Sequence, residues 1–321
     1  NSVLLLVKSG IKVFISFILK QSMGPIKPNV FVVGVPRSGK VQIRNALSKH
    51  PQIYVNMVDT DFFSADVEGK QDRINSIQKY LTYFQEGKKK KIILDQVSRS
   101  AVSKIAAKKI KEFNPKAKII IHLRSPAEQM FSWHNACIRL GYETEPDFLK
   151  ALQLEKKRKE KNNPSIIKNY YYRDMADYYP QVKRYIDTFG RKNVHIIILD
   201  ELRANEDKVY YKLLKFLGVK KQKPDFTTKN EARMEPKNKF FVHFTNFFIN
   251  LPRPLRLAVK LILSPKIVTK IKAYTLTELK EKKKLDPNLE HQINKSFEPN
   301  IKKLEKMIGK DLSTWYKNKR Q

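Results

Sequence analysis

The stretch from residue 30 to residue 47 most constrains what this chain can fold into. Its first part reads VFVVGVPRSGK, in which four β-prone residues run into a loop bounded by Gly34 and Gly39, and VQIRNAL then follows, which is typical of a helix opening. A strand, a tight loop and a helix N-terminus together form an anion cradle, because backbone N–H groups converge there and the helix dipole favours negative charge. The sequence therefore predicts that a phosphate or a sulfate binds on this loop.

The rest of the chain alternates short β-prone runs with helix-like stretches, which is the order that a parallel sheet with crossover helices requires. The further predicted strands are 53–55, 91–95, 117–123 and 194–199. The predicted helices run to about 49 and over 74–84, 102–113, from Pro126 to about 140, 175–189 and 207–217, with a charged helix end or loop at 156–161. The expected fold class is α/β: one P-loop-like domain with a central parallel β-sheet flanked by helices, plus a helical C-terminal extension.

The first 24 residues form a separate predicted unit. Apolar runs are interrupted there at steps of four by Lys8, Lys12, Ser16 and Lys20. Because residues four apart share one face of a helix, residues 1–24 are expected to form a basic amphipathic helix that lies on a membrane or on the protein's own surface. A Gly- and Pro-containing breaker at 24–28 precedes the main domain, 29–321, whose helical extension begins at about 230.

The net charge and the cysteine content limit which classes of partner and which cellular compartment the sequence favours. The 321 residues include 65 Lys and Arg against 31 Asp and Glu, a formal net charge of +34, which suits solvated surfaces, polyanionic substrates, an anionic membrane or nucleic acid. No zinc-ligand spacing, aromatic RNA-binding signature or basic heptad region supports nucleic acid, so no nucleic-acid partner is expected. The single cysteine, Cys137, fits a small apolar helix residue in a reducing compartment and favours a cytoplasmic location.

A second anion-binding motif follows the strand predicted at 117–123. The sequence LRSPAEQMFS at 123–132 places Arg124 at the carboxyl end of that strand, where ligands of open α/β sheets collect. The Arg fork suits bidentate phosphate binding, and Ser132, about two helical turns later, offers a hydroxyl. The alternative for Arg124 is an ordinary ion pair at the strand end.

Five segments in chain order resemble the sulfotransferases that use 3′-phosphoadenosine 5′-phosphosulfate, in the bacterial branch related to heparan-sulfate sulfotransferases. They are GVPRSG at 34–39, LRSPAEQMFS at 123–132, NVHIIILDEL at 193–202, NEARM at 230–234 and the tail at 297–315. Each motif alone is weakly specific, but their common order covers nearly the whole chain. The resemblance implies a nucleotide donor as co-substrate, no metal, and transfer of the sulfuryl group to a hydroxyl or amine of a carbohydrate or glycolipid.

The resemblance also implies which residues hold this donor. The segment 34–39 is similar to the family's 5′-phosphosulfate loop, and the pair Arg124 and Ser132 is similar to its 3′-phosphate motif. The implied donor-binding residues are Pro36, Arg37, Ser38, Gly39, Lys40, Val41, Arg124 and Ser132.

Sulfuryl transfer needs positive charge at the leaving oxygen and a base for the incoming hydroxyl, as phosphoryl transfer does. Arg37 occupies the family's loop-cation position, and Lys40 adds a second catalytic charge beside it. The family places a Glu shortly before a Phe-Phe pair, and here Asp59 stands at that distance from the pair at 62–63. Asp59 is therefore the expected base, with a loop-capping role as the alternative and with Asp61 and Asp95 as the next candidates.

The residues Lys40 and Val41 depart from the family pattern, which has hydroxyl residues there. The loop becomes Gly-x-x-x-x-Gly-Lys, close to a Walker A motif, and IIILDE at 196–201 is similar to a Walker B strand end. A P-loop kinase or ATPase that uses Mg-ATP is therefore an alternative, although Val41 cannot ligate magnesium as the usual Ser or Thr does. A non-catalytic binding protein with the sulfotransferase fold is the third hypothesis.

An apolar and basic stretch at 240–263 is relevant to the question of which acceptor the protein uses. It either packs as helices on the sheet or joins the N-terminal helix in holding the protein peripherally at an anionic membrane, within reach of a glycolipid or lipid-linked saccharide. An acidic polysaccharide suits the net positive charge equally well.

Overall fold

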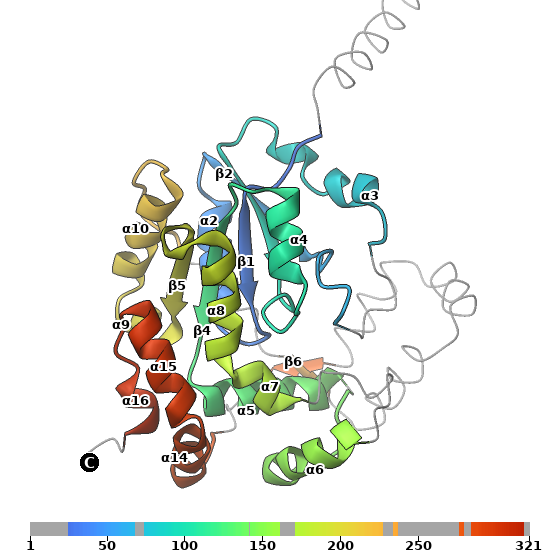
Figure 1. Ribbon diagram of the computed structural model, residues 1–321, viewed down its shortest axis with the longest axis vertical. Coiled ribbons are helices and arrows are strands. Elements are labelled where there is room, and N and C mark those ends of the chain that lie inside the picture. The colour runs from blue at the N-terminus through green and yellow to red at the C-terminus, as the bar shows by residue number, and fades with distance from the viewer. Residues whose placement is uncertain are drawn as a thin grey trace, which may run out of the picture.

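Five parallel strands form the central sheet of the computed structural model, which describes residues 25–67, 74–140, 142–160, 171–226, 234–236, 276–278 and 284–317. Their order across the sheet is β2-β3-β1-β4-β5 (Figure 1). The strands are β1 (Val30–Gly34), β2 (Ile53–Asp59), β3 (Ile92–Val97), β4 (Lys118–Leu123) and β5 (Val194–Ile198), and a separate antiparallel pair joins β6 (Met234–Pro236) to β7 (Leu276–Glu278). The predicted α/β class with a parallel sheet is confirmed.

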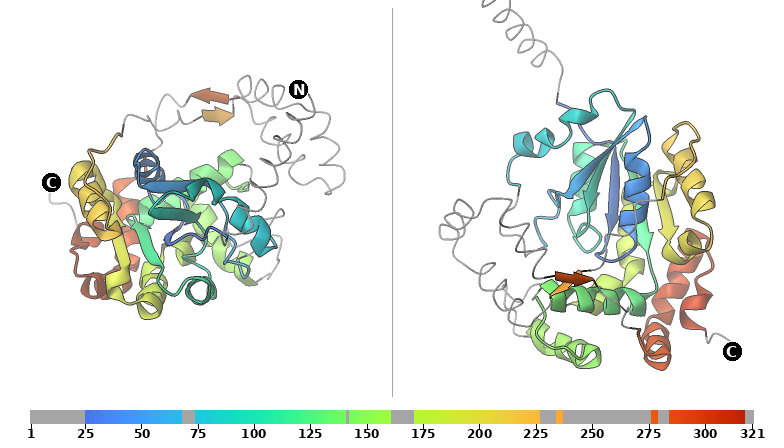
Figure 2. Two further views of the ribbon diagram at one scale, coloured as in Figure 1. Left: turned by 90° about the horizontal axis from the view of Figure 1, so that it is seen from above. Right: turned by 180° about the vertical axis from the view of Figure 1, so that it is seen from behind.

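Helices cover both faces of this sheet (Figures 1 and 2). The described helices are α2 (Lys40–Ser48), α3 (Ile77–Thr82), α4 (Ala106–Phe113), α5 (Pro126–Leu140), α6 (Phe148–Glu160), α7 (Tyr172–Ala176), α8 (Tyr178–Phe189), α9 (Leu199–Ala204), α10 (Glu206–Leu217), α14 (Pro287–Ser296), α15 (Glu298–Ile308) and α16 (Ser313–Tyr316). Two short 3₁₀ turns, Gln85–Gly87 and Arg191–Asn193, complete the set among these residues.

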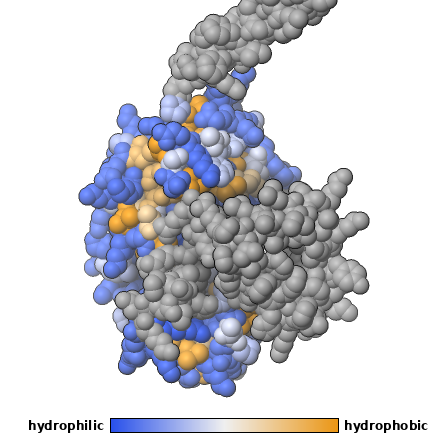
Figure 3. All heavy atoms as spheres, turned by 90° about the vertical axis from the view of Figure 1, so that its right-hand side faces the viewer, coloured by the Kyte–Doolittle hydropathy of each residue, from blue (hydrophilic) through white to orange (hydrophobic). Residues whose placement is uncertain are grey.

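Side-chain alternation along β1 divides the core into two layers. Val30 and Val32 pack with α2, α9 and α10 on one face, while Phe31 and Val33 pack with α4, α5 and α8 on the other. All five residues of β1 are buried, as expected for the central strand of a parallel sheet with both faces covered. Charged residues are consequently displaced outward, and Figure 3 shows a largely hydrophilic surface over the described part of one face.

The carboxyl ends of β1 and β4 bring the two predicted anion-binding motifs together. The two strands pair in parallel, with Gly34 opposite His122, so the loop after β1 and the turn after β4 emerge side by side. The chain leaves β1 toward β2 on one side and returns at β4 on the other, and crevices at such switch points bind ligands in open α/β sheets. Helix α5 lies across these strand ends in Figure 1.

Several predicted boundaries differ from the structure. β2 continues to Asp59, beyond the predicted end at 55, and the predicted helix 74–84 is shortened to α3 and a 3₁₀ turn because the Ser76 side chain caps Lys79 N–H at 3.1 Å. The predicted helix 175–189 is two helices that meet at Asp177, and the end of the predicted strand 194–199 instead begins α9. Strong apolar spacing hides such breaks, since each piece keeps its buried face.

The C-terminal helices α14, α15 and α16 confirm the predicted helical extension over 284–317, whereas the other two described segments of that region, β6 and β7, are strands and not helical. Asp286 begins α14 by accepting a hydrogen bond from Leu289 N–H at 2.8 Å, with Pro287 in the first turn. The expected N-terminal helix at 1–24 and the apolar, basic stretch at 240–263 lie outside the described residues. None of the helices searched, all within the described ranges, combines the length and the apolar character that a membrane span needs.

Candidate functional site

The loop after β1 has a strained, closely packed backbone. Arg37 adopts a φ of 69°, in the left-handed region that non-glycine residues seldom occupy, and Gly39 follows at 91°. A Cβ on Gly39 would approach Leu199 Cδ1 to 2.6 Å, so both conformation and space require glycine there. Ser38 is buried and donates from Oγ to Val35 O at 2.9 Å, which closes the loop on itself.

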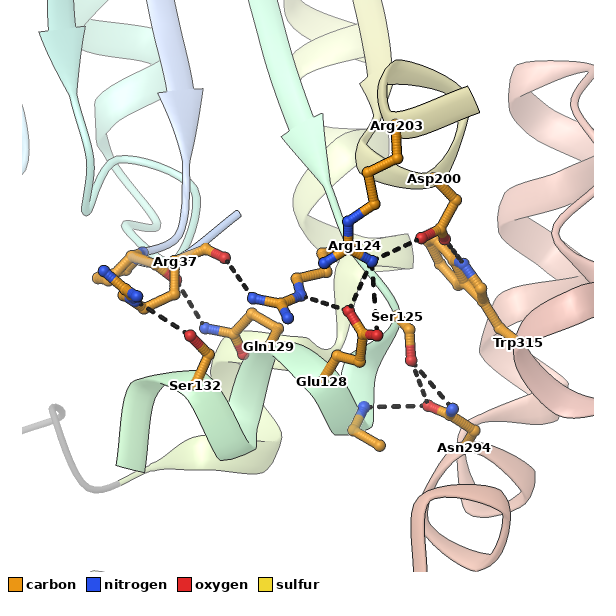
Figure 4. Close-up of polar contacts among 12 residues, drawn as sticks. Arg37, Arg124, Ser125, Glu128, Gln129, Ser132, Asp200, Arg203, Asn294 and Trp315 are labelled. Carbon is orange, nitrogen blue, oxygen red and sulfur yellow. Dashed lines mark hydrogen bonds and ion pairs between the residues drawn. The ribbon is translucent and has the colours of Figure 1, made fainter. Parts of the chain in front are cut away.

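Side chains of α5 hold this loop from the neighbouring motif. Arg37 Nε donates to Ser132 Oγ at 3.0 Å, and Gln129 Nε2 donates to Pro36 O at 2.9 Å (Figure 4). Arg124 adds a third contact, from Nη1 to Arg37 O at 3.3 Å. The two predicted anion-binding motifs, separated by about ninety residues of sequence, therefore form one continuous polar surface.

Arg124 extends from the end of β4 into a cluster of charged side chains. Its Nε donates to Glu128 Oε2 at 2.7 Å, and Arg203 Nη1 from α9 lies 3.1 Å from the same oxygen. Partial burial alone would raise the pKa of Glu128, but the two guanidinium groups outweigh it and hold the pKa below its ordinary value. The ion pair expected as the alternative role of Arg124 thus exists, and it fixes the guanidinium beside the loop.

Lys40 begins α2 but its side chain turns under the loop. It is 8% exposed, and its ammonium group donates to Ser98 Oγ just beyond the end of β3. Burial lowers the pKa of Lys40, and the carboxylates of Asp59 and Asp61 partly oppose that shift. The positive charge of Lys40 therefore lies between the loop and the two aspartates.

The three candidate bases occupy different environments. Asp59 is exposed at the end of β2, and Asp61 is half-buried with Oδ1 accepting from Arg99 N at 3.0 Å. Asp95 is completely buried, and burial raises its pKa to about 7 although three neutral donors hydrogen-bond to it. Those donors are Tyr80 OH at 2.7 Å, Thr60 Oγ1 at 2.9 Å and Asn56 Nδ2 at 3.2 Å. Of the three carboxylates, Asp59 is the most exposed to solvent.

The histidines near the predicted motifs and the single cysteine are buried in the protein. His50 Nε2 and His134 Nε2 lie 3.0 and 2.8 Å from the main-chain oxygens of Lys220 and Glu145. Burial lowers the pKa of His122 to about 3, and burial also raises the pKa of the Cys137 thiol. The His122 imidazole and the Cys137 thiol therefore remain neutral inside the protein.

The residues similar to Walker motifs have other partners. Asp200 lies in the first turn of α9 after the edge strand β5, with β4 between β5 and β1. Its Oδ2 accepts from Trp315 Nε1 at 2.8 Å, and its Oδ1 is 3.3 Å from Arg203 Nη1 (Figure 4). Val41 is 46% exposed and apolar. Within the described ranges, no three His, Cys, Asp or Glu side chains group as metal ligands would.

Sequence reasoning missed three polar residues at the site. Glu128 follows Arg124 by one helical turn, so its ion pair could have been read from the i, i+4 spacing. Gln129 contacts Pro36, 93 residues away in the sequence, and Arg203 contacts Glu128, 75 residues away. No local sequence pattern predicts such distant contacts.

Comparison with known proteins agrees with this geometry. The model of the family described as "Sulfotransferase domain" matches residues 27–247. Two curated relatives, the bifunctional heparan sulfate N-deacetylase/N-sulfotransferase 1 of Caenorhabditis briggsae and that of Caenorhabditis elegans, are each 22% identical, over 71% and 66% of this chain. The chain spans about a quarter of the length of these relatives, 27% and 24%.

The fold also has a solved counterpart. A crystal structure of a sulfotransferase from Alicyclobacillus acidocaldarius superposes with a TM-score of 0.64 at 23% identity, covering 90% of this chain and 99% of that one. The common fold includes the parallel sheet and extra C-terminal helices. Since the family model covers most of the sheet domain and both anion-binding motifs, the chain belongs to the sulfotransferase domain family.

Proposed function

We propose that this protein transfers a sulfuryl group from 3′-phosphoadenosine 5′-phosphosulfate to a hydroxyl or amine acceptor. The observation that carries the proposal is the contact of Arg37 with Ser132, because it joins a loop suited to the 5′-phosphosulfate to a motif suited to the 3′-phosphate. A nucleotide with phosphates at both ends of its ribose matches this pair of neighbouring cationic positions. Membership of the sulfotransferase family supports the same donor.

In the proposed complex the loop and α5 share the donor. Backbone N–H groups of residues 37–41, with the Ser38 and Gly39 turn and the start of α2, surround the 5′-phosphosulfate, and Pro36 lies at the edge of this loop. Arg124 and Ser132 take the 3′-phosphate, and the Arg124 fork exchanges part of its contact with Glu128 for the ligand. Arg37 lies between the two sites.

The reaction follows from these positions. An acceptor hydroxyl approaches sulfur in line with the bridging oxygen, the new bond from acceptor oxygen to sulfur forms, and the bond from sulfur to the bridging oxygen breaks. The acceptor proton passes to Asp59, and the leaving adenosine 3′,5′-bisphosphate keeps the electron pair. Arg37 stabilises the negative charge on the leaving oxygen, and Lys40 contributes a second positive charge from below the loop.

The proposed acceptor is a carbohydrate, free or linked to lipid. The relatives in Caenorhabditis are named for heparan sulfate, and the formal charge of +34 favours an anionic saccharide or an anionic surface. A cytoplasmic protein held peripherally at a membrane by residues 1–24 would reach a lipid-linked saccharide. Flotation with anionic vesicles tests this part, since binding that disappears on removal of residues 1–24 supports it and absence of binding contradicts it.

Calorimetry with adenosine 3′,5′-bisphosphate, and separately with Mg-ATP, tests the donor. Preference for the bisphosphate that is lost in Arg124→Ala supports the proposal, because that side chain would hold the 3′-phosphate. Preference for Mg-ATP, or an unchanged bisphosphate affinity in Arg124→Ala, contradicts it. The matched control is Arg191→Ala, because Arg191 contacts main-chain oxygens of Val194 and Ile308 away from the site.

A further inference from the structure

The first turn of α5 is capped by a residue from the C-terminal helices. Ser125 O accepts from Gln129 N–H at 2.9 Å, which makes Ser125 the N-cap residue of α5. A serine at this position ordinarily accepts a hydrogen bond from an N–H of the first turn. Here Asn294 of α14 does so instead, with Oδ1 accepting from Ala127 N–H at 3.0 Å (Figure 4).

Asn294 also fixes the serine hydroxyl. Its Nδ2 lies 3.0 Å from Ser125 Oγ, and the same hydroxyl lies 3.2 Å from Asn294 Oδ1. Asn294 is 1% exposed and Ser125 is 4% exposed, so water cannot readily replace these bonds. A buried amide whose donor and acceptor are both used holds its partners in one arrangement.

This cap lies next to Arg124 in the chain. Leu123 ends β4 on one side of Arg124, and Ser125 begins the capped turn on the other. The sheet therefore fixes the backbone before Arg124, and Asn294 fixes the backbone after it. The direction in which the guanidinium leaves the backbone depends on both.

A second chain of contacts joins the C-terminal helices to the same guanidinium. Trp315 Nε1 donates to Asp200, whose other oxygen pairs with Arg203. Arg203 in turn shares Glu128 with Arg124 (Figure 4). The C-terminal helices thus support both the backbone and the charged partners of Arg124.

We propose that Asn294 is a positioning residue for the 3′-phosphate site: it aims Arg124 by capping α5 from α14. This inference rests on the proposed function, since it assumes that Arg124 binds the 3′-phosphate. It gives the C-terminal helices a part in nucleotide selectivity beyond their packing on the domain.

The test compares two nucleotides that differ only in the 3′-phosphate, adenosine 3′,5′-bisphosphate and adenosine 5′-monophosphate. In Asn294→Ala the ratio of their affinities is expected to fall about tenfold, with the monophosphate affinity unchanged, which is within the range measured for residues that share a hydrogen-bond network. The matched control is Ile293→Val, a neighbouring buried residue of α14 with a purely apolar side chain, which should keep the wild-type ratio. An unchanged ratio in Asn294→Ala, or equal weakening of both nucleotides, would overturn the inference.

A double-mutant cycle separates positioning from general destabilisation. If Asn294 acts through Arg124, Asn294→Ala should have no further effect on the ratio in the Arg124→Ala background, and an additive loss would contradict the inference. Ser125→Ala provides a milder variant, because it removes the hydroxyl and leaves the bond from Ala127 to Asn294. A smaller loss in the same ratio is expected for Ser125→Ala, and no loss in both variants counts against the cap.

The same measurements distinguish an error in the proposed function from an error in the role of Asn294. If the wild-type protein itself shows no preference for the bisphosphate, the proposed donor is wrong. If the wild type has that preference and the folded Asn294→Ala variant retains it in full, only the role of Asn294 is wrong.

Discussion

Arg37 Nε donates a hydrogen bond to Ser132 Oγ over 3.0 Å, and this contact joins the loop after β1 to α5. The backbone of Arg37 is strained, with a φ of 69°, so the loop is held in a conformation that it would not favour alone. Preorganised cationic groups bind a charged ligand with less reorganisation than mobile ones. The loop and α5 are thus held together by the protein's own side chains.

Ser132→Ala should weaken binding of adenosine 3′,5′-bisphosphate about tenfold, because a hydrogen bond to a charged group is removed at a partly buried site. Calorimetry measures the change. Ser48→Ala is the control, since that hydroxyl bonds only to Asn45 O on its own helix, at 2.8 Å. Equal effects of the two substitutions would show that Ser132 has no special part in binding.

Gly39→Ala should lower the free energy of unfolding by more than Gly218→Ala does. Both glycines adopt the left-handed conformation, with φ of 91° and 73°, and this backbone costs an alanine about 1–2 kcal/mol. A Cβ at Gly39 also meets Leu199, whereas one at Gly218 meets nothing within 4 Å. Urea denaturation gives both values, and nucleotide affinity should fall in Gly39→Ala alone. Retained affinity there would argue that the loop does not hold the donor.

Lys40→Met should reduce turnover at least about tenfold while leaving the free energy of unfolding similar or higher, because an apolar chain of similar length replaces a buried charge. Turnover and urea denaturation are measured on the same preparation. The control Lys49→Met removes a half-exposed lysine paired with Asp225 and should change neither by much. Full turnover in Lys40→Met would exclude a catalytic role for that charge.

The free energy of unfolding of the wild-type protein, relative to that of the Asp95→Asn variant, should be higher in mild acid than at neutral pH. The pKa of Asp95 is about 7 in the folded protein against 3.8 ordinarily, so between these pH values the folded state holds a proton that the unfolded state has lost. The stability that Asp95 contributes therefore falls as pH rises from about 4 to about 7, by at most about 1.4 kcal/mol per pH unit.

Urea denaturation of wild type and Asp95→Asn across that pH window measures this slope. The buried His122 and the half-buried His195, whose folded pKa values lie at about 3 and 4, act in the opposite direction, but they are present in both proteins and cancel in the difference. A difference that does not vary with pH would show that Asp95 is ionised in the folded protein throughout.

Local patterns were sufficient to predict the sheet and to place the two candidate motifs at the carboxyl ends of its strands. Continuous apolar runs such as 117–123 indicate buried parallel strands, and Arg124 must then emerge at their carboxyl edge. The break between α7 and α8 at Asp177 was missed because the apolar spacing continues through it.

Side-chain directions and distant partners were not predictable in this way. Lys40 was expected beside Arg37 in the loop, and its chemistry depends on Ser98, 58 residues away at the end of β3. Asn294 caps α5 from a helix 169 residues beyond Ser125, and nothing in the sequence around either residue signals the pair. Such contacts arise only once the helices pack.

Transfer of a radiolabelled sulfuryl group from 3′-phosphoadenosine 5′-phosphosulfate to a panel of saccharides tests the central claim most directly. The wild-type protein should label at least one saccharide, and Asp59→Asn should reduce labelling at least about a hundredfold, the scale of general base catalysis, while its affinity for adenosine 3′,5′-bisphosphate is retained. Labelling by Asp59→Asn at the wild-type rate would contradict the role of Asp59. Tight binding of the donor by the wild type without transfer to any acceptor would contradict the account and leave a binding protein with the sulfotransferase fold.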